Sequence, residues 1–205
     1  IGIGGDINYS YYVDAGILAD ISDYEGLGDV KQAYLDIAEE LKLIPKEGTY
    51  ILPYVANAAG ILYNKDIFEQ AGLDPNSPPK TMDELVDYAK TITEKTGIPG
   101  LGWGIKSQED FANVVESFYS SYTGEDIWND VDKCFTFENN EENKKRFAEA
   151  LDLMAEITND YGITQANPIE YNPYALRTLF RDGECGMYID GVWAVKELLS
   201  ELEKG

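Results

Sequence analysis

The sequence predicts an α/β fold with largely parallel pairing of its strands. Short apolar segments typical of strands, such as 101–105 and 185–189, alternate with segments whose apolar residues recur at helical spacing. Glycine, proline and helix-capping residues separate the two kinds of segment. The chain has 205 residues, and 44% of them are hydrophobic, which is enough for a packed core. Strands that alternate with helices in this way are typical of α/β domains.

The first quarter of the chain predicts a short strand, two helices and two further strands. Asp6 is placed to cap the first helix, and Gly16 is placed to end it. The second helix is expected over about 29–42, because apolar residues recur along one of its faces. Segment 49–64 predicts two short strands, which Pro53 interrupts.

The middle of the chain predicts three helices. A short one ends at Gly72, and the next begins after Thr81, where Glu84 three residues later completes a capping box. A third helix is expected over 108–122. The helix after Thr81 should bury one apolar face, made of Met82, Leu85, Val86, Ala89 and Ile92.

The last third of the chain predicts a short strand at 135–137 and three more helices. Asn140 can cap a long helix that Gly162 ends, and Pro173 suits the first turn of a helix that Gly183 ends. A final helix directly follows the strand at 185–189. The long helix has an apolar stripe made of Phe147, Leu151, Met154, Ile157 and Tyr161.

Charge and composition exclude several classes of function. The net charge is -22, from 38 acidic and 16 basic residues, so the surface repels phosphate backbones and anionic membranes. We therefore expect no nucleic-acid partner, and the acid excess favours solubility. The absence of histidine excludes Ser/His/Asp triads, Cys/His dyads and His-containing zinc sites. Carboxylates, lysines and tyrosines still leave acid–base catalysis open.

The two cysteines and the two chain ends allow further expectations. Cys134 and Cys185 could form a disulfide or could be two buried thiols. No apolar run is long enough to span a bilayer. The chain starts at Ile1 inside an apolar stretch and stops at Gly205 after a helix, so we expect a fragment of a longer mature protein.

Catalytic, cofactor and metal motifs are not evident. There is no P-loop and no GxSxG, and the glycines of the GIGGD segment at 2–6 lack the spacing of a dinucleotide-binding loop. The acidic segment 126–134 lacks the glycine and glutamate of an EF-hand. No pair of carboxylates stands out as a glycosidase acid and nucleophile. We therefore predict a protein that is not an enzyme and that needs no cofactor or metal.

Aromatic and polar residues near strand ends favour carbohydrate binding. A sugar offers a weakly apolar CH face edged with hydroxyls, which suits an aromatic ring beneath it and Asp or Asn side chains beside it. Trp193 follows a strand by three residues, where α/β ligand crevices open, and Asp190 stands at the end of that strand. Asp6 and Tyr9 follow the first strand, and Asn57 lies where the chain is expected to cross between lobes. These are candidate ligand-binding residues.

Other aromatic residues give weaker indications. Trp103 lies between glycines inside an expected strand, which favours a place in the core. Tyr54, Phe111 and Trp128 fit either core packing or ligand contact, and Tyr54 and Phe111 are included among the candidate ligand-binding residues.

Two segments carry a resemblance to a known family. The segment 52–93 resembles the central signature of family 1 extracellular solute-binding proteins, the group that includes the maltodextrin-binding protein. The segment 179–195 resembles the second signature of that family, and the opening segment 4–24 resembles its first-lobe strand and helix. The matching residues are Pro53, Tyr63, Asn64, Lys65, Gly72, Pro79, Thr81, Glu84, Leu85, Phe180, Gly183, Met187, Gly191, Trp193 and Ala194.

The resemblance implies a periplasmic-binding-protein-like (type II) fold of two hinged α/β lobes, present here as part of the first lobe and most of the second. It implies a partial first lobe at 1–52, a hinge crossing at 53–60 and an incomplete second lobe at 61–205. It also implies a monomer that binds a saccharide between its lobes and delivers it to ABC transporter permease subunits. Such proteins are periplasmic, or extracellular and lipid-anchored at the outer face of the cell membrane.

One departure from the family and two rival functions stay open. Val192 stands where the family commonly has proline, so the turn that leads to Trp193 is expected to be looser. An acidic cleft would also suit a polyamine or a metal ion. A carboxylate-dependent glycan-processing enzyme is the rival from a different class.

Overall fold

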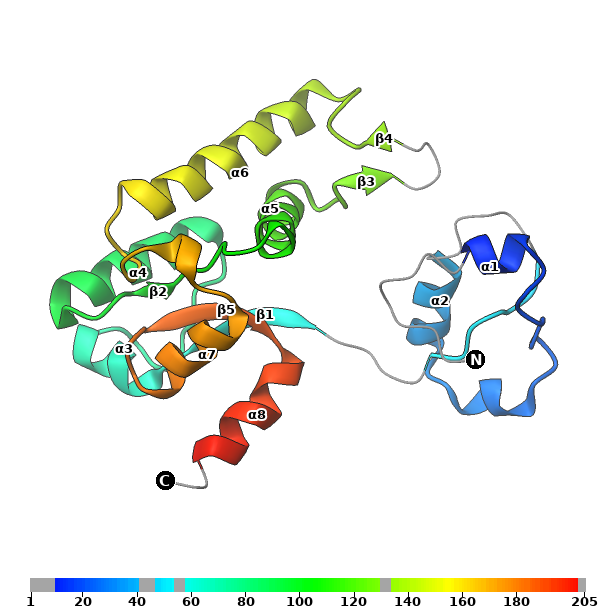
Figure 1. The fold of residues 1–205 in the computed structure, drawn as a ribbon, viewed down its shortest axis with the longest axis horizontal. Helices are drawn as coiled ribbons and strands as arrows, with labels where there is room; N and C mark the ends of the chain where they lie inside the picture. Colours follow the sequence, from blue (N-terminus) through cyan, green and yellow to red (C-terminus); the bar gives the residue numbers. More distant parts are fainter. Residues whose placement is uncertain (1–9, 41–46, 54–57, 130–133, 203–205) are drawn as a thin grey trace. The chain divides into compact units, whose positions relative to one another are not determined.

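The computed structural model describes residues 10–40, 47–53, 58–129 and 134–202. The chain divides into two compact units, one within Ile1–Ala56 and the other within Asn57–Asn129 and Cys134–Gly205 (Figure 1). The division falls inside the segment 53–60, where the sequence predicts the hinge crossing.

The first unit contains three short helices. They are α1 (Ser10–Asp14), the 3-10 helix η1 (Glu25–Asp29) and α2 (Gln32–Glu40). Gly16 has a φ of 68°, a left-handed conformation that suits the exit from α1. The helix expected over 29–42 thus begins later, at Gln32, because η1 extends to Asp29.

A carboxylate joins two loops of this unit. Asp20 accepts hydrogen bonds from the backbone and hydroxyl of Ser22 and from the backbone of Thr49, at 2.6–3.1 Å. The Ile21 backbone also donates to the Thr49 carbonyl at 2.7 Å. These bonds hold segment 47–53 against the loop that follows α1.

The second unit is built on a three-stranded sheet of order β1-β5-β2. Its strands are β1 (Ala59–Tyr63), β2 (Leu101–Gly102) and β5 (Met187–Gly191). In β1, Ala59 lies opposite Gly191 in antiparallel register, whereas β2 is parallel to β5, with Leu101 beside Met187. The strand expected over 101–105 is therefore only two residues long.

The prediction of largely parallel pairing is wrong for β1. A single helix between two strands carries the chain back to the edge at which the first strand began, and this makes the strands parallel. Two helices, α3 (Lys65–Ala71) and α4 (Met82–Thr96), lie between β1 and β2. The chain therefore re-enters the sheet at the edge where β1 ended, so β2 runs in the direction opposite to β1.

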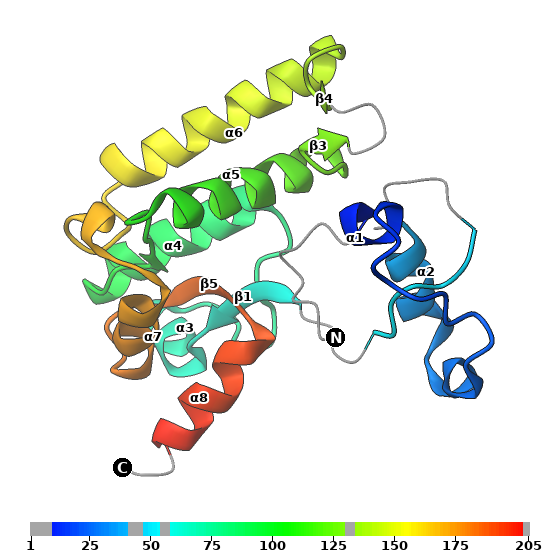
Figure 2. The same cartoon turned by 45° about the vertical axis from the view of Figure 1, so that its right-hand side comes forward.

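The main core lies between the sheet and four helices, namely α3, α4, α5 (Gln108–Thr123) and α6 (Glu141–Asn159). Helices α5 and α6 lie side by side in both views (Figures 1 and 2). The predicted face of α4 is confirmed, since Leu85, Val86, Ala89 and Ile92 are buried. On α6 the stripe is wrong at one position, because Leu151 is exposed and Ala150 is buried in its place.

A second, smaller core covers the opposite face of β5. It lies beneath α7 (Pro173–Arg181) and α8 (Val192–Leu202). Its buried residues are Leu176, Cys185, Tyr188, Ala194 and Leu198. Because neighbouring strand residues point to opposite faces, Met187 enters the main core and Tyr188 enters the second one. Strand β5 is therefore covered on both faces.

Local sequence signals set most helix boundaries of this unit. The Asn140 side chain accepts from the backbones of Glu142 and Asn143, as predicted. The Thr81 hydroxyl accepts from the Glu84 backbone at 3.1 Å. The Glu84 carboxylate accepts from the Lys80 backbone, one residue before the cap, so the capping box is shifted by one position.

The remaining elements are small. A hairpin of β3 (Trp128–Asn129) and β4 (Cys134–Phe135) precedes α6, so the strand expected at 135–137 lies slightly earlier. The 3-10 helix η2 (Pro168–Glu170) precedes α7. Cys134 and Cys185 are both free thiols, which settles the question of a disulfide. Among the described residues, no helix is both long and apolar enough to cross a membrane.

Candidate functional site

Three chain segments meet at one edge of the sheet in the second unit. The parallel strands β5 and β2 both end toward this edge, and the antiparallel strand β1 starts there. Helix α8 follows β5 directly, and α5 follows β2 after five residues. Ligand sites of α/β sheets lie outside the carboxyl ends of the strands. This edge is therefore where we look for the predicted binding residues of the second unit.

Trp193 lies at this edge, in the first turn of α8. Its side chain is 51% exposed, so the indole is neither part of the packed core nor fully in solvent. The six-membered ring of the indole lies against Gly191, at the position that a Cβ of residue 191 would occupy. The last residue of β5 must therefore be a glycine for the indole to lie here. The ring rests on the strand end with one surface and leaves the rest of its surface open.

The turn between β5 and α8 is anchored to β1. The backbone N–H of Val192 donates to the Ala58 carbonyl at 2.9 Å, just before β1 begins. Proline, which the family commonly has at this position, has no N–H and cannot make this bond. Val192 instead holds the turn by this hydrogen bond to the residue that precedes β1.

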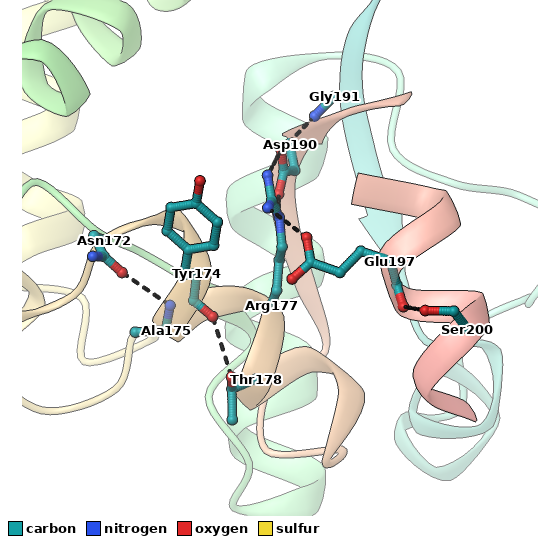
Figure 3. Close-up of polar contacts among 9 residues, drawn as sticks. All are labelled: Asn172, Tyr174, Ala175, Arg177, Thr178, Asp190, Gly191, Glu197 and Ser200. Atoms are coloured by element: carbon teal, nitrogen blue, oxygen red, sulfur yellow. Dashed lines mark hydrogen bonds and ion pairs between the residues drawn. The ribbon is translucent and has the colours of Figure 1, made fainter. Parts of the chain in front are cut away.

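A buried ion pair lies directly beneath the turn (Figure 3). The Arg177 guanidinium donates from Nε to Asp190 Oδ2 at 2.7 Å and from Nη2 to Asp190 Oδ1 at 3.2 Å. A third bond runs from Nη1 to the carboxylate of Glu197 on α8, at 2.9 Å. The hydrogen bond to Asp190 raises the pKa of Arg177 above its ordinary value, so this side chain stays charged.

Asp190, which the sequence suggests as a ligand-binding residue, is therefore not freely exposed for contact with a ligand. Its side chain is only 4% exposed, and both of its oxygens accept hydrogen bonds within the chain. Oδ1 also accepts from the Gly191 backbone at 2.7 Å. These bonds tie the end of β5 to α7.

Tyr174 is a further exposed aromatic residue, which sequence reasoning missed. It lies in the first turn of α7 and is 67% exposed, with the Arg177 guanidinium 5.0 Å from the centre of its ring. Helix α7 leads into β5 through a short turn, so the start of α7 lies toward the carboxyl end of β5. The available signal was Pro173, which marks the start of α7 just before Tyr174.

The other aromatic candidates fall into different environments. Phe111 is in the first turn of α5 and 44% exposed. Trp128 is 37% exposed in the β3–β4 hairpin, where it packs edge-on against Phe135. Trp103 is 2% exposed and its indole N–H donates to Thr158, which confirms the prediction of a core residue.

The remaining candidates lie outside the described residues. They are Asp6, Tyr9, Tyr54 and Asn57. Ala58 follows Asn57 in the sequence and is the residue that accepts the bond from Val192. Within the described ranges, no group of three or more His, Cys, Asp or Glu side chains could hold a metal ion.

The fold and this sheet edge define an α/β solute-binding domain. The chain matches the bacterial extracellular solute-binding proteins over residues 3–203, and it belongs to that family. The family is made of transport receptors rather than enzymes, as the sequence predicts.

Solved structures of two-lobe solute-binding proteins share the fold. A solute-binding protein from Thermotoga lettingae, bound with α-D-tagatose, is 25% identical with a TM-score of 0.70 over 92% of this chain and 46% of that one. The cyclic α-maltosyl-1,6-maltose binding protein from Arthrobacter globiformis is 28% identical with a TM-score of 0.64, over 91% and 44%. RafE from Streptococcus pneumoniae, at 24% identity and a TM-score of 0.72 over 95% and 48%, supports the fold.

Curated relatives are longer than this chain. A binding protein of Brucella abortus is 29% identical over 153 residues, which are 75% of this chain and 35% of that protein. The sn-glycerol-3-phosphate-binding periplasmic protein UgpB of Salmonella typhimurium is 37% identical over 84 residues, which are 41% of this chain and 17% of that protein. The chain spans less than half the length of the relatives that it matches.

Proposed function

We propose that this chain belongs to the substrate-binding component of an ABC importer and that the component captures a mono- or oligosaccharide. The observation that carries the proposal is the indole of Trp193, which is half-exposed and held at the carboxyl edge of the sheet. A flat ring in this position suits the CH face of a sugar. The family membership and the sugars bound by several solved relatives support the same class of ligand.

The candidate residues take different roles in this proposal. Trp193 stacks on the sugar, while Phe111 and Tyr174 offer further aromatic surface at helix starts. Asp6, Tyr9, Tyr54 and Asn57 are proposed to contact the sugar, the polar ones through hydrogen bonds to its hydroxyls. Asp190 acts through its bonds to Gly191 and Arg177.

Capture and delivery follow the general physics of two-state receptors. A ligand that binds the closed arrangement of two lobes more tightly than the open one shifts the population toward the closed form. We propose that the closed monomer then docks on the permease subunits. We also propose a location outside the cytoplasmic membrane, either in the periplasm or lipid-anchored at the outer face.

The test is a binding screen on the protein as its gene encodes it. Thermal-shift measurements and calorimetry would compare D-tagatose, maltose and raffinose with spermidine and divalent metal ions. The proposal predicts that at least one sugar binds and raises the melting temperature, because a ligand that binds only the folded state stabilises it. Binding of spermidine or a metal, with no response to any sugar, would reject it.

A second candidate ligand is sn-glycerol-3-phosphate. It is favoured by the relative that binds this compound and is 37% identical over 84 residues. A phosphate ligand needs fixed positive charge, and Arg177, the buried cation of the described edge, is occupied by Asp190 and Glu197. We therefore favour a sugar over sn-glycerol-3-phosphate as the ligand. Adding sn-glycerol-3-phosphate and glycerol to the same screen separates the two, since a phosphate site binds the first and not the second.

A further inference from the structure

We infer that Arg177 and Asp190 form a positioning pair that sets the orientation of the Trp193 indole, and that the same arginine steadies the ring of Tyr174. This inference rests on the proposed sugar site, because it assigns to two buried residues the task of holding the aromatic surface of that site. Neither residue needs to touch the ligand.

The Arg177–Asp190 pair is well buried. The side chains of Arg177 and Asp190 are 10% and 4% exposed, and they share two hydrogen bonds. A planar guanidinium with two parallel bonds to a carboxylate fixes orientation as well as distance. The pair therefore holds the last residues of β5 in one position relative to α7.

Gly191 connects the pair to the indole. Asp190 Oδ1 accepts from the Gly191 backbone at 2.7 Å, so the carboxylate that Arg177 orients also fixes the peptide that precedes Gly191. The Trp193 ring lies directly against Gly191. A shift of that peptide must therefore move the surface on which the indole rests.

Arg177 also bonds to α8. Arg177 Nη1 donates to Glu197, which lies one turn beyond Trp193 on the same helix. Figure 3 shows the guanidinium between the end of β5 and this glutamate. Glu197 is 50% exposed, so its ion pair with Arg177 stabilises the arrangement less than the pair with the buried Asp190 does. The arginine thus contacts both ends of the turn that presents Trp193.

Arg177 also contacts a second exposed ring, that of Tyr174. The guanidinium lies 5.0 Å from the centre of the Tyr174 ring, within the range of a cation–π contact. Tyr174 and Trp193 are exposed aromatics from two different helices, and Arg177 is the cation that contacts the ring of one and the support of the other. The buried Arg177 side chain therefore helps to hold both exposed rings of the candidate sugar site in place.

The first experiment needs no ligand. The protein is labelled with 5-fluorotryptophan, and the Trp193 resonance is assigned from its loss in Trp193→Phe. Arg177→Lys keeps the buried charge but loses the bidentate hydrogen bonding to Asp190. It should shift or broaden the Trp193 resonance and leave the Trp103 resonance unchanged. The matched control is Arg181→Lys on the same helix, where the arginine pairs with the exposed Asp182, and it should change neither.

The second experiment is a double-mutant cycle on sugar binding, with the sugar that binds most tightly in the screen. Arg177→Lys should weaken binding about fivefold when Trp193 is present and less than about twofold in Trp193→Ala, because coupled residues are not additive. Melting curves show whether each variant is folded. If Arg177→Lys does not fold, Glu197→Gln, which loosens the same turn from the outer side, replaces it in both experiments.

The outcomes are separable. An unchanged Trp193 resonance in the Arg177 variant overturns the positioning role, and so do equal losses of affinity with and without Trp193. If no sugar binds to the unsubstituted protein, the proposed function fails, while the fluorine spectra still decide whether Arg177 and Asp190 orient the indole.

Discussion

Replacing Trp193 with alanine is the most informative perturbation of the candidate site. About half of the indole is buried against the strand end, and 51% is open. A tryptophan side chain offers up to roughly 250 Å² of surface, so a sugar can cover about 100 Å² of the open half. At about 25 cal/mol per Å², this contact stabilises the complex by about 2.5 kcal/mol. The loss of a stacking ring from nucleic-acid sites costs about 1–3 kcal/mol, which agrees.

We therefore expect Trp193→Ala to weaken sugar binding roughly 70-fold, from a loss of about 2.5 kcal/mol. Calorimetry with the best sugar of the screen measures the change in Kd. The matched control is Trp128→Ala, which removes a similarly exposed indole from the β3–β4 hairpin and should leave the Kd unchanged. A Kd within twofold of the unsubstituted protein, in a variant that melts normally, would refute the reasoning.

Three further predictions concern stability, each measured by urea unfolding. Val192→Pro should lower the free energy of unfolding by about 1 kcal/mol relative to Val192→Ala, because proline cannot donate to Ala58, and a more stable proline variant would contradict this. Burial raises the pKa of the Cys185 thiol to about 12, so the unfolded chain releases this proton first as the pH rises from about 9. The protein should therefore lose stability relative to Cys185→Ala by up to about 1.4 kcal/mol per pH unit between pH 9 and 12, and parallel pH curves would show that the thiol is not buried. Thr81→Ala should cost about 1 kcal/mol through loss of the cap of α4, whereas Thr81→Ser should restore it, and equal effects of both would argue against capping.

The sequence predicted the features that depend on neighbouring residues. Asn140 and Thr81 cap helices through side-chain bonds to residues two or three positions away, so a single segment contains the whole signal. The strand that ends just before Trp193 was also predictable, because a short apolar run followed at once by a helical pattern fixes the junction. An exposed indole at a strand end follows from that local pattern.

The features that sequence reasoning missed depend on distant contacts. The antiparallel direction of β1 reflects the two helices that separate it from β2, and no property of the strand itself reports this. Arg177 and Asp190 are 13 residues apart and meet only because α7 packs on β5. Tyr174 is exposed beside that arginine, and the sequence around Tyr174 gives no sign of a cation partner. Such pairings become visible only when the packing of the elements is known.

The most direct test of the central claim is a structure of the protein, as its gene encodes it, with a bound sugar. The account predicts that a sugar ring lies with its CH face against the Trp193 indole, at the carboxyl edge of the sheet, while Arg177 and Asp190 stay paired beneath it. A sugar bound elsewhere, with the indole free of any contact to it, would contradict the account.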